Sequence, residues 1–251
     1  MVKIALLQTD ILWAGIETNH NNAEKSILSV KEGVDLFVLP EMWSTGFAVE
    51  PEGIAEEHDE SLLWMKKIAA KTDAAVAGSV AVKQDGRYHN RFFFVKPDGE
   101  VAYYDKRHLF TYGGEAERYT AGTERVVVDW RGARFLLQTC YDLRFPCFSR
   151  NHSPYYDCIL YVASWPSSRR PVWDVLLQAR ALENQCYVVG VNRVGNDAAS
   201  QYNGGSVIVS PYGKTIVQAK DDKAEVIIAD IDIDKLHAFR KKFPVLEDRD
   251  R

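Results

Sequence analysis

The chain has 251 residues, of which 46% are hydrophobic and 26% are charged, and its net charge is −4. This size and composition are typical of a globular protein with a substantial buried core. The slightly negative charge argues against the basic stripe of a nucleic-acid-binding protein. No apolar run approaches the roughly 18–20 residues of a membrane span, and the N-terminal stretch lacks a signal-peptide pattern. We therefore expect a cytoplasmic protein that has no nucleic-acid or membrane partner.

The first part of the chain alternates strand-like and helix-like segments. Apolar runs and helical spacing predict strand, helix, strand, helix and strand at Val2–Gln8, Glu17–Lys31, Asp35–Leu39, Asp59–Lys71 and Ala75–Val82. Asp59 or Ser61 is a candidate N-cap for the second helix, because both side chains can accept a backbone hydrogen bond. This βαβαβ order is typical of an α/β protein.

The rest of the chain is richer in strands. Short apolar runs and turn signals predict strands at Tyr88–Lys96, Val101–Tyr104, Val126–Asp129, Arg134–Thr139, Asp157–Val162, Cys186–Asn192, Gly205–Ser210, Thr215–Gln218 and Glu225–Asp230. Helices are predicted at Phe145–Asn151, Val172–Asn184 and Ile233–Lys242. The hairpins indicate α/β layers with mixed sheets whose faces are covered by helices. No linker, repeat or low-complexity tract interrupts residues 1–251, which we interpret as one domain.

Three ionisable residues each follow a predicted strand, where functional groups of α/β proteins gather. Glu41 follows the strand DLFVLP, Lys106 follows VAYYD, and Cys140 ends FLLQT. A free thiol is mostly protonated near neutral pH, since its reference pKa is about 8.5. A nearby carboxylate could take that proton, and an ammonium could stabilise the oxyanion formed when sulfur attacks a carbonyl. These three residues could therefore perform acyl transfer through a thioester.

A Cys/His pair is the alternative, and among the six histidines His108 is the best candidate base because it lies two residues from Lys106. His108 could instead brace the loop. The other cysteines have plainer interpretations: Cys158 and Cys186 lie in apolar strands as buried small residues, and Cys147 lies in the first turn of a short helix. No Cys/His set has zinc-like spacing, so we expect no metal and no other cofactor.

Several stretches resemble a known family. LPEMWSTGF, YDKRHLF and CYDLRFP resemble, in order, the three signature stretches of the nitrilase (carbon–nitrogen hydrolase) family. GEAERYTAG, SWP and ARALENQCYVVGVNRVG further resemble its omega-amidase branch, whose members hydrolyse the terminal amide of 2-oxo acids such as 2-oxoglutaramate and 2-oxosuccinamate. The resemblance implies a four-layer α-β-β-α sandwich, and family members form dimers or larger homo-oligomers.

The resemblance also implies residue roles. Glu41 matches the family's general base, Cys140 the nucleophile, and Lys106 the group that stabilises the tetrahedral intermediate. A second glutamate positions the lysine, and the spacing to the following glycine favours Glu115 over Glu117. The backbone N–H of Tyr141 matches the second oxyanion donor.

Pocket residues are less well defined by the motifs. Trp43, Phe47, Phe110 and Trp165 could form pocket walls. Arg144 has two interpretations: it pairs with Asp142 to hold the turn, or it grips a substrate carboxylate as a bidentate fork. The other arginines considered for that carboxylate are Arg107, Arg169 and Arg170, although the last two resemble a solvated loop. Arg180, Glu183 and Asn184 are interpreted as structural or interfacial.

The function predicted from these observations is an omega-amidase that releases ammonia and a 2-oxo dicarboxylate. A second interpretation keeps the mechanism and changes the small-molecule substrate to an N-carbamoyl amino acid, a nitrile or another short-chain amide. A third is a non-catalytic binding or redox protein that uses Cys140 as a reactive thiol. The presence of Glu41, Lys106 and Glu115 together argues against it.

Overall fold

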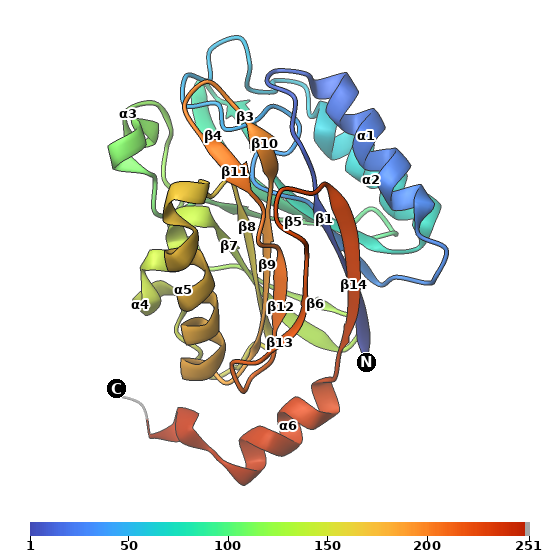
Figure 1. Ribbon diagram of the computed structural model, residues 1–251, viewed down its shortest axis with the longest axis vertical. Helices are drawn as coiled ribbons and strands as arrows, with labels where there is room; N and C mark the ends of the chain where they lie inside the picture. Colours follow the sequence, from blue (N-terminus) through green and yellow to red (C-terminus); the bar gives the residue numbers. More distant parts are fainter. Residues whose placement is uncertain (249–251) are drawn as a thin grey trace.

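The computed structural model describes residues 1–248 as two six-stranded sheets packed face to face, with helices on both outer sides (Figure 1). The first sheet contains β1 (Val2–Gln8), β2 (Leu36–Val38), β3 (Ala75–Gln84), β4 (Arg87–Val95), β5 (Val101–Asp105) and β14 (Glu225–Ile231). The second contains β6 (Val127–Trp130), β7 (Ala133–Thr139), β8 (Cys158–Ala163), β9 (Tyr187–Asn192), β12 (Val207–Val209) and β13 (Thr215–Gln218).

The α-helices are α1 (Ile16–Ser29), α2 (Glu60–Thr72), α3 (Glu115–Arg118), α4 (Pro146–Ser149), α5 (Arg170–Glu183) and α6 (Ile233–Lys242). Short 3₁₀ turns occur at η1 (Thr111–Gly113), η2 (Cys140–Arg144), η3 (Ser167–Arg169) and η4 (Val245–Glu247). Nearly every predicted element is present within a few residues of its expected bounds.

Both sheets mix parallel and antiparallel pairs. In the order β14-β1-β2-β3-β4-β5, the three central strands are parallel and the outer ones antiparallel. In the order β13-β12-β9-β8-β7-β6, the parallel strands are β9, β8 and β7. Parallel neighbours require crossover connections, and α1, α2 and α5 provide three of them. The predicted mixed sheets are confirmed.

The middle of strand β1, Ile4–Leu7, is an unbroken apolar run, and its burial explains why. Ile4 and Leu6 face the core between the two sheets, whereas Ala5 and Leu7 face the core under the helices. Successive side chains of a strand point to opposite faces, so a strand buried on both faces must be apolar at every position. The four-layer α-β-β-α sandwich follows from such strands.

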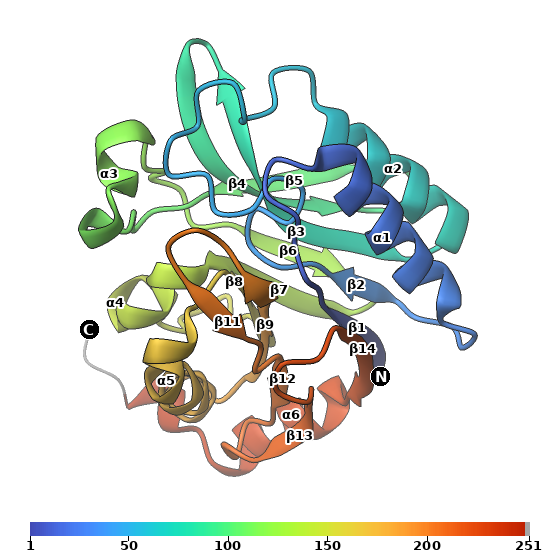
Figure 2. The same ribbon diagram turned by 45° about the horizontal axis from the view of Figure 1, so that its top comes forward.

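Three apolar cores separate the four layers. α1 and α2 cover the first sheet with residues such as Ile27 and Ile68. The core between the sheets includes Phe94 and Phe135, whose ring centres are 6.0 Å apart. α5 covers the second sheet through residues such as Leu177. Figure 2 shows the two helical layers on opposite sides of the sheets, with α6 across one end.

The structure differs from the sequence-based prediction at several points, among them the short helix α3, which was not predicted. A two-stranded ribbon, β10 (Val194–Asn196) and β11 (Gln201–Asn203), was not predicted, because each strand has only three residues and little apolar character. Neither candidate cap contributes its side chain to α2: Asp59 has a left-handed backbone and makes no capping bond, and the Ser61 hydroxyl donates to Glu56.

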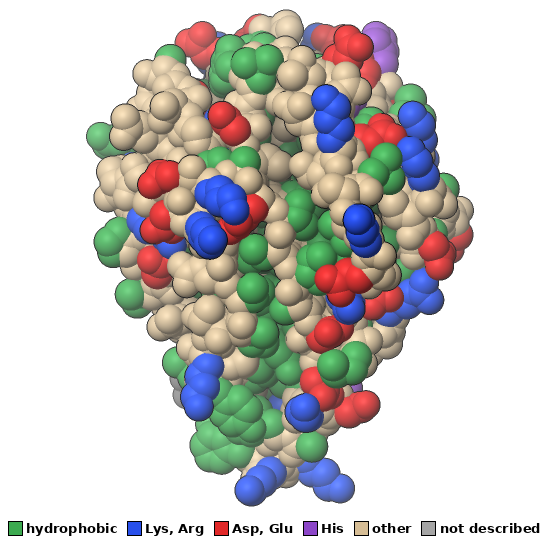
Figure 3. All heavy atoms as spheres, turned by 45° about the vertical axis from the view of Figure 1, so that its right-hand side comes forward, with side chains coloured by type: hydrophobic (Ala, Val, Ile, Leu, Met, Phe, Trp, Pro, Cys, Tyr) green, Lys and Arg blue, Asp and Glu red, His purple; other side chains and the backbone are tan. Residues whose placement is uncertain are grey.

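The surface carries charges of both signs. On the face in Figure 3, Lys and Arg side chains are interspersed with Asp and Glu rather than gathered in one broad basic patch. Among the described residues, no helix is long and apolar enough to cross a membrane.

Candidate active site

The side chains of Glu41, Lys106 and Cys140 meet where strand ends of the two sheets come together. Glu41 follows β2 after two residues, and Lys106 directly follows β5; both strands belong to the first sheet. Cys140 directly follows β7 of the second sheet. Residues far apart in the sequence are thus brought together at one end of the sandwich.

Lys106 lies between two carboxylates in the interior of the protein. Its Nζ is 2.8 Å from Glu41 Oε1 and 2.8 Å from Glu115 Oε2. Both glutamates are fully buried, and Lys106 is 1% exposed. Of the two glutamates considered in GEAERYTAG, it is therefore Glu115 that reaches the lysine, whereas Glu117 is exposed.

The backbone at Lys106 is also fixed. Its N–H donates to Asn90 O at 2.9 Å, and its carbonyl accepts from Gly122 N at 3.1 Å. Gly122 has no room for a side chain, since a Cβ there would lie 2.1 Å from the carbonyl oxygen of Asp105. This close approach explains why the chain needs a glycine there.

Backbone and amide donors complete the coordination of the two carboxylates. Asn90 Nδ2 donates to Glu41 Oε1 at 2.8 Å and to Glu115 Oε1 at 3.0 Å. The N–H of Ser164 donates to Glu41 Oε2 at 2.8 Å, and that of Phe110 donates to Glu115 Oε2 at 2.6 Å. Buried carboxylates held by several donors are stabilised in defined orientations.

Burial and neighbouring charges shift the pKa values of Lys106 and Glu115 in this cluster. Burial lowers the pKa of Lys106, but Glu115 and Glu41 outweigh this effect and raise that pKa, so the ammonium stays charged. Burial also raises the pKa of Glu115, which Lys106 opposes.

The Cys140 thiol stays protonated in this environment. Burial and the charge of Glu41 raise the pKa of the thiol well above its ordinary value, although Lys106 lowers it. Sulfur can therefore become nucleophilic only if a base removes the proton as the attack occurs.

The turn that carries Cys140 is held by Asp142. Cys140 has a φ of +46°, which is uncommon for a non-glycine residue and places it in a sharp bend between β7 and η2. The buried Asp142 accepts hydrogen bonds from Thr139 N at 2.9 Å and from the Tyr104 hydroxyl at 2.7 Å. It thereby ties the cysteine turn to the end of β5, next to Lys106.

His108 hydrogen-bonds to Asp142 rather than to Cys140. Its Nδ1 lies 2.8 Å from Asp142 Oδ1, its N–H donates to the same oxygen at 3.0 Å, and its ring stacks on Phe145 at 4.1 Å. The carboxylate of Asp142 is therefore bound to neighbours other than Arg144, and the proposed Asp142–Arg144 pair is absent from the described residues. His108 braces the loop, as the alternative interpretation anticipated.

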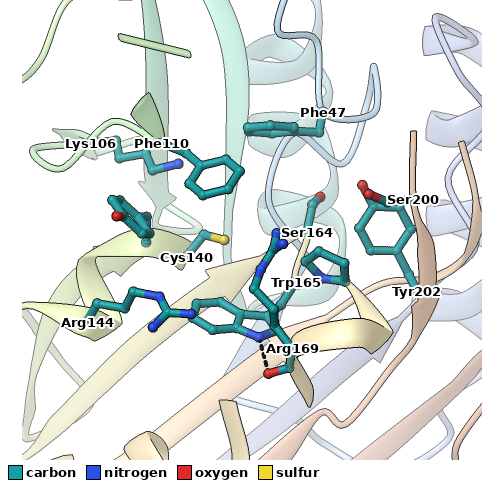
Figure 4. A pocket seen from close by; sticks show the side chains of 12 residues that line it. Phe47, Lys106, Phe110, Cys140, Arg144, Ser164, Trp165, Arg169, Ser200 and Tyr202 are labelled. Atoms are coloured by element: carbon teal, nitrogen blue, oxygen red, sulfur yellow. Dashed lines mark hydrogen bonds between the residues drawn. The ribbon is translucent and has the colours of Figure 1, made fainter. Parts of the chain in front are cut away.

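A small cavity opens over Cys140 (Figure 4). Its volume is about 60 Å³, whereas sites for drug-sized ligands measure roughly 300–1,000 Å³. The residues that line it are Phe47, Lys106, Phe110, Cys140, Tyr141, Arg144, Ser164, Trp165, Pro166, Arg169, Ser200 and Tyr202. Such a cavity suits a substrate of few heavy atoms.

Five of the six predicted pocket residues line this cavity, and one does not. The prediction for Trp43 is wrong: its side chain is 2% exposed and packs under α1 and α2, with its ring 5.1 Å from His20 and 4.7 Å from Trp64. Residues 41–45 form a turn in which Met42 has a positive φ of +44°, so Trp43 points to the helical layer although Glu41, two residues earlier, reaches Lys106.

Two arginines in the stretch SSRRP are not in a solvated loop, contrary to the prediction. Arg169 lines the cavity, with its guanidinium carbon 5.2 Å from the centre of the Phe110 ring. Arg170 is 9% exposed and forms ion pairs with Asp174 and Asp221. The two side chains diverge because Arg169 ends η3 and Arg170 begins α5.

Sequence reasoning missed several residues of the site. Asn90, the backbone of Ser164, and Ser200 and Tyr202 of the ribbon were not anticipated. Asn90 had a detectable signal: it is the polar residue on a strand face that continues with the buried Phe92 and Phe94. No pattern in the sequence marks the ribbon as adjacent to Cys140.

The arrangement can perform nucleophilic acyl transfer. It combines a thiol with a buried carboxylate and a buried ammonium, which form an ion pair and both act on the charge state of the thiol. Within residues 1–248, no three His, Cys, Asp or Glu side chains are grouped to hold a metal ion. The absence of a metal from the reaction stays a prediction.

Comparisons with known proteins agree with this geometry. The chain is 43% identical over 251 residues to the omega-amidase YafV of Yersinia enterocolitica, covering 100% of this chain and 97% of the relative. It is 33% identical to the 2-oxoglutaramate amidase of Bacillus subtilis, covering 98% and 96%. The crystal structure of XC1258 from Xanthomonas campestris, a CN-hydrolase superfamily protein with an arsenic adduct in its active site, superposes with a TM-score of 0.96 at 37% identity, covering 100% and 97%.

The family model described as carbon-nitrogen hydrolase matches residues 3–241, nearly the whole chain. The predicted resemblance is therefore confirmed, and the chain belongs to the carbon–nitrogen hydrolase family.

Proposed function

We propose that this protein is an omega-amidase, which hydrolyses the terminal amide of a short 2-oxo acid to a 2-oxo dicarboxylate and ammonia. Family membership and two relatives named omega-amidase and 2-oxoglutaramate amidase support an amidase of this kind. The observation that carries the proposal is the thiol of Cys140 in the electrostatic field of the buried Glu41–Lys106 ion pair, where Cys140 and Lys106 line the same small cavity.

In the first half of the proposed reaction, Cys140 Sγ attacks the amide carbon while its proton moves to Glu41. The carbonyl π electrons move onto oxygen, where the Lys106 ammonium and the Tyr141 N–H stabilise the oxyanion. Collapse of this intermediate breaks the C–N bond. The departing nitrogen takes the proton from Glu41 and leaves as ammonia, and a thioester remains on Cys140.

In the second half, water replaces ammonia. Glu41 takes a proton from the water as its oxygen attacks the thioester carbon, and a second oxyanion forms at the same donors. Collapse breaks the C–S bond, the sulfur recovers the proton from Glu41, and the carboxylic acid product leaves. Glu115 binds Lys106 throughout and orients it.

The substrate carboxylate has two candidate partners in the cavity. Arg144 lies with its guanidinium carbon 5.2 Å from the Trp165 ring, and Arg169 lies similarly against Phe110. Among the described residues, neither guanidinium forms an ion pair with an acidic side chain, whereas Arg170 next to them forms two. Two unpaired guanidinium groups in one small cavity suit an anionic substrate. In Figure 4, Arg144 lies below Cys140, and the side chain of Arg169 extends upward beside it.

Ammonia release from a panel of amides tests the proposal. The panel contains 2-oxoglutaramate, 2-oxosuccinamate, glutamine, N-carbamoyl-β-alanine and a simple nitrile. We expect the highest kcat/KM for one of the two 2-oxo acid amides. A clear preference for the carbamoyl compound or the nitrile would reassign the substrate within the same mechanism, and no hydrolysis by a folded protein would contradict the enzyme assignment.

We also propose that the protein is a cytoplasmic homodimer. Two apolar side chains on α5, Val175 and Leu182, are 64% and 53% exposed. They lie seven residues apart and hence on one face of the helix. A second copy of the chain would bury them.

A further inference from the structure

Asn90 is a polar residue in an apolar part of the molecule. It lies on β4, and its side chain is fully buried on the strand face that also carries Phe92 and Phe94. These phenylalanines belong to the core between the sheets. Burial of an amide is unfavourable unless hydrogen bonds replace those it made to water. A residue kept at such a position needs specific partners.

Both hydrogens of the Asn90 amide point to the two buried carboxylates. Nδ2 donates to Oε1 of Glu41 and to Oε1 of Glu115, and the backbone carbonyl of the same residue accepts from Lys106 N. Its Oδ1 has no hydrogen-bond partner among the described residues. An unsatisfied buried oxygen costs stability. At this position the amide N–H groups of Asn90 bind the two carboxylates, whereas its amide oxygen is left without a hydrogen bond among the described residues.

These contacts distinguish the two oxygens of Glu41. Oε1 receives two donors, from Asn90 and Lys106, whereas the one donor to Oε2 within residues 1–248 is the N–H of Ser164. A carboxylate oxygen accepts about two hydrogen bonds, so a position remains on Oε2. The Asn90 amide also donates to both carboxylates without adding a charge to the cluster. The two carboxylates therefore continue to share the ammonium of Lys106.

We propose that Asn90 is a positioning residue for this reaction: it holds Glu41 and Glu115 together and leaves Oε2 of Glu41 as the basic atom for the Cys140 proton. This inference rests on the proposed role of Glu41 as the base. Asn90 does not contact the thiol or the cavity, so it acts through Glu41 rather than on the substrate.

The direction of the effect on pH dependence follows from the contacts. The groups that face the cluster are Glu41, Glu115, Lys106, Cys140 and the buried Tyr119, whose hydroxyl donates to Ala48 O. An N–H bonded to a carboxylate favours its ionised form, so loss of the Asn90 donors raises the pKa of the carboxylates. The base would then be protonated up to a higher pH, and the acid limb of the activity profile would move upward.

The test uses alkylation of Cys140 by iodoacetamide, followed by site-resolved mass spectrometry as a function of pH. Asn90→Asp keeps the shape and replaces the donor by a third carboxyl group, and Asn90→Ser leaves at most one donor. Cys147 is exposed, so all proteins carry Cys147→Ser. Asn151→Asp is the matched control, because Asn151 is also fully buried and donates from Nδ2 to two acceptors, the carbonyls of Tyr156 and Asn184, away from the site.

We expect Asn90→Asp and Asn90→Ser to slow alkylation near pH 7 by roughly ten- to a hundredfold, the range for losing a hydrogen bond to a charged group. The acid limb should move to higher pH, further for Asp, and kcat should fall more than KM rises. The control should lower the melting temperature and leave the alkylation profile unchanged. If Asn90→Asp does not fold, the alkylation profile of Asn90→Ser tests the proposal.

An unchanged alkylation profile in a folded Asn90 variant would overturn the inference. Alkylation requires no amide substrate, so this result is independent of the proposed function. If none of the panel amides is hydrolysed, the omega-amidase proposal fails while the alkylation profile still reports on Asn90.

Discussion

At Cys140, the left-handed backbone places a thiol in the lining of the cavity, and burial and the charge of Glu41 keep that thiol protonated by raising its pKa. Cys140→Ala removes the nucleophile, so turnover should be abolished. Cys158→Ala and Cys186→Ala change buried side chains, so they should lower stability and keep the chemistry. The measurements are ammonia release and melting temperature, with the exposed Cys147→Ala as control. Substantial activity in folded Cys140→Ala would rule out the thioester mechanism.

Glu41 and His108 can be separated as candidate bases by substitution. Glu41→Gln keeps the shape and removes the basicity, so kcat should fall by about 10²–10⁴-fold, the usual contribution of a positioned base. His108→Asn disturbs a brace against Asp142 and Phe145, so its effect should be milder. Steady-state kinetics of both variants decide the matter: an active Glu41→Gln beside an inactive His108→Asn would favour the Cys/His assignment.

Arg144 and Arg169 allow a test of carboxylate recognition. Lysine keeps the charge and loses the planar fork, so Arg144→Lys and Arg169→Lys should each lower kcat/KM for a 2-oxo acid amide about tenfold or more. Butyramide, which lacks the carboxylate, should be little affected, and Arg107→Lys, an exposed arginine outside the cavity, serves as control. Equal losses on both substrates together with a lower melting temperature would assign the arginine a structural role.

Among the elements, α1, α2 and the loop after Glu41 are joined by a polar cluster. The buried carboxylate of Glu56 accepts from the hydroxyls of Ser44 and Ser61 and from the Ser61 N–H, and the Ser61 hydroxyl contacts His20 of α1. Burial raises the pKa of Glu56 above its ordinary value. The loop that carries Glu41 and Phe47 is thus anchored to the helical layer that covers the first sheet.

His20 makes this anchor sensitive to pH. Burial lowers the pKa of His20 to about 4, below the ordinary value of about 6.5. Because the folded protein binds the proton more weakly than the unfolded chain, its stability should fall as the pH drops from about 6.5 towards 4. The urea midpoint of His20→Gln should fall less over this range, with the exposed His152→Gln as control. Parallel pH dependence in His20→Gln and the unsubstituted protein would show that other groups are responsible.

On the scale of the whole molecule, the proposed dimer depends on α5. Analytical ultracentrifugation of the unsubstituted protein should give twice the chain mass. Val175→Asp and Leu182→Asp place charges on the exposed apolar face of α5 and should shift the equilibrium towards monomers. Glu117→Lys, an exposed change on α3, is the control. A monomeric unsubstituted protein at micromolar concentration would contradict the proposal.

The layers could be predicted because their signals are local. In β1, Ile4–Leu7 form a continuous apolar run since they are buried on both faces, and α1 and α2 show helical spacing since each buries one face. The order of Glu41, Lys106 and Cys140 after three strands was also visible, because strand ends in α/β proteins gather functional groups.

The environment of each side chain depends on the tertiary structure and could not be predicted from the sequence. Trp43 and Phe47 lie four residues apart in one motif, yet one packs under the helices and the other lines the cavity. Adjacent Arg169 and Arg170 likewise diverge into the cavity and an ion-pair network. Asn90, Ser164 and Tyr202 join the site from β4, the end of β8 and the ribbon. Sequence patterns report burial and periodicity along one element, whereas hydrogen-bond partners and pKa shifts depend on which elements the packing of the two sheets brings together.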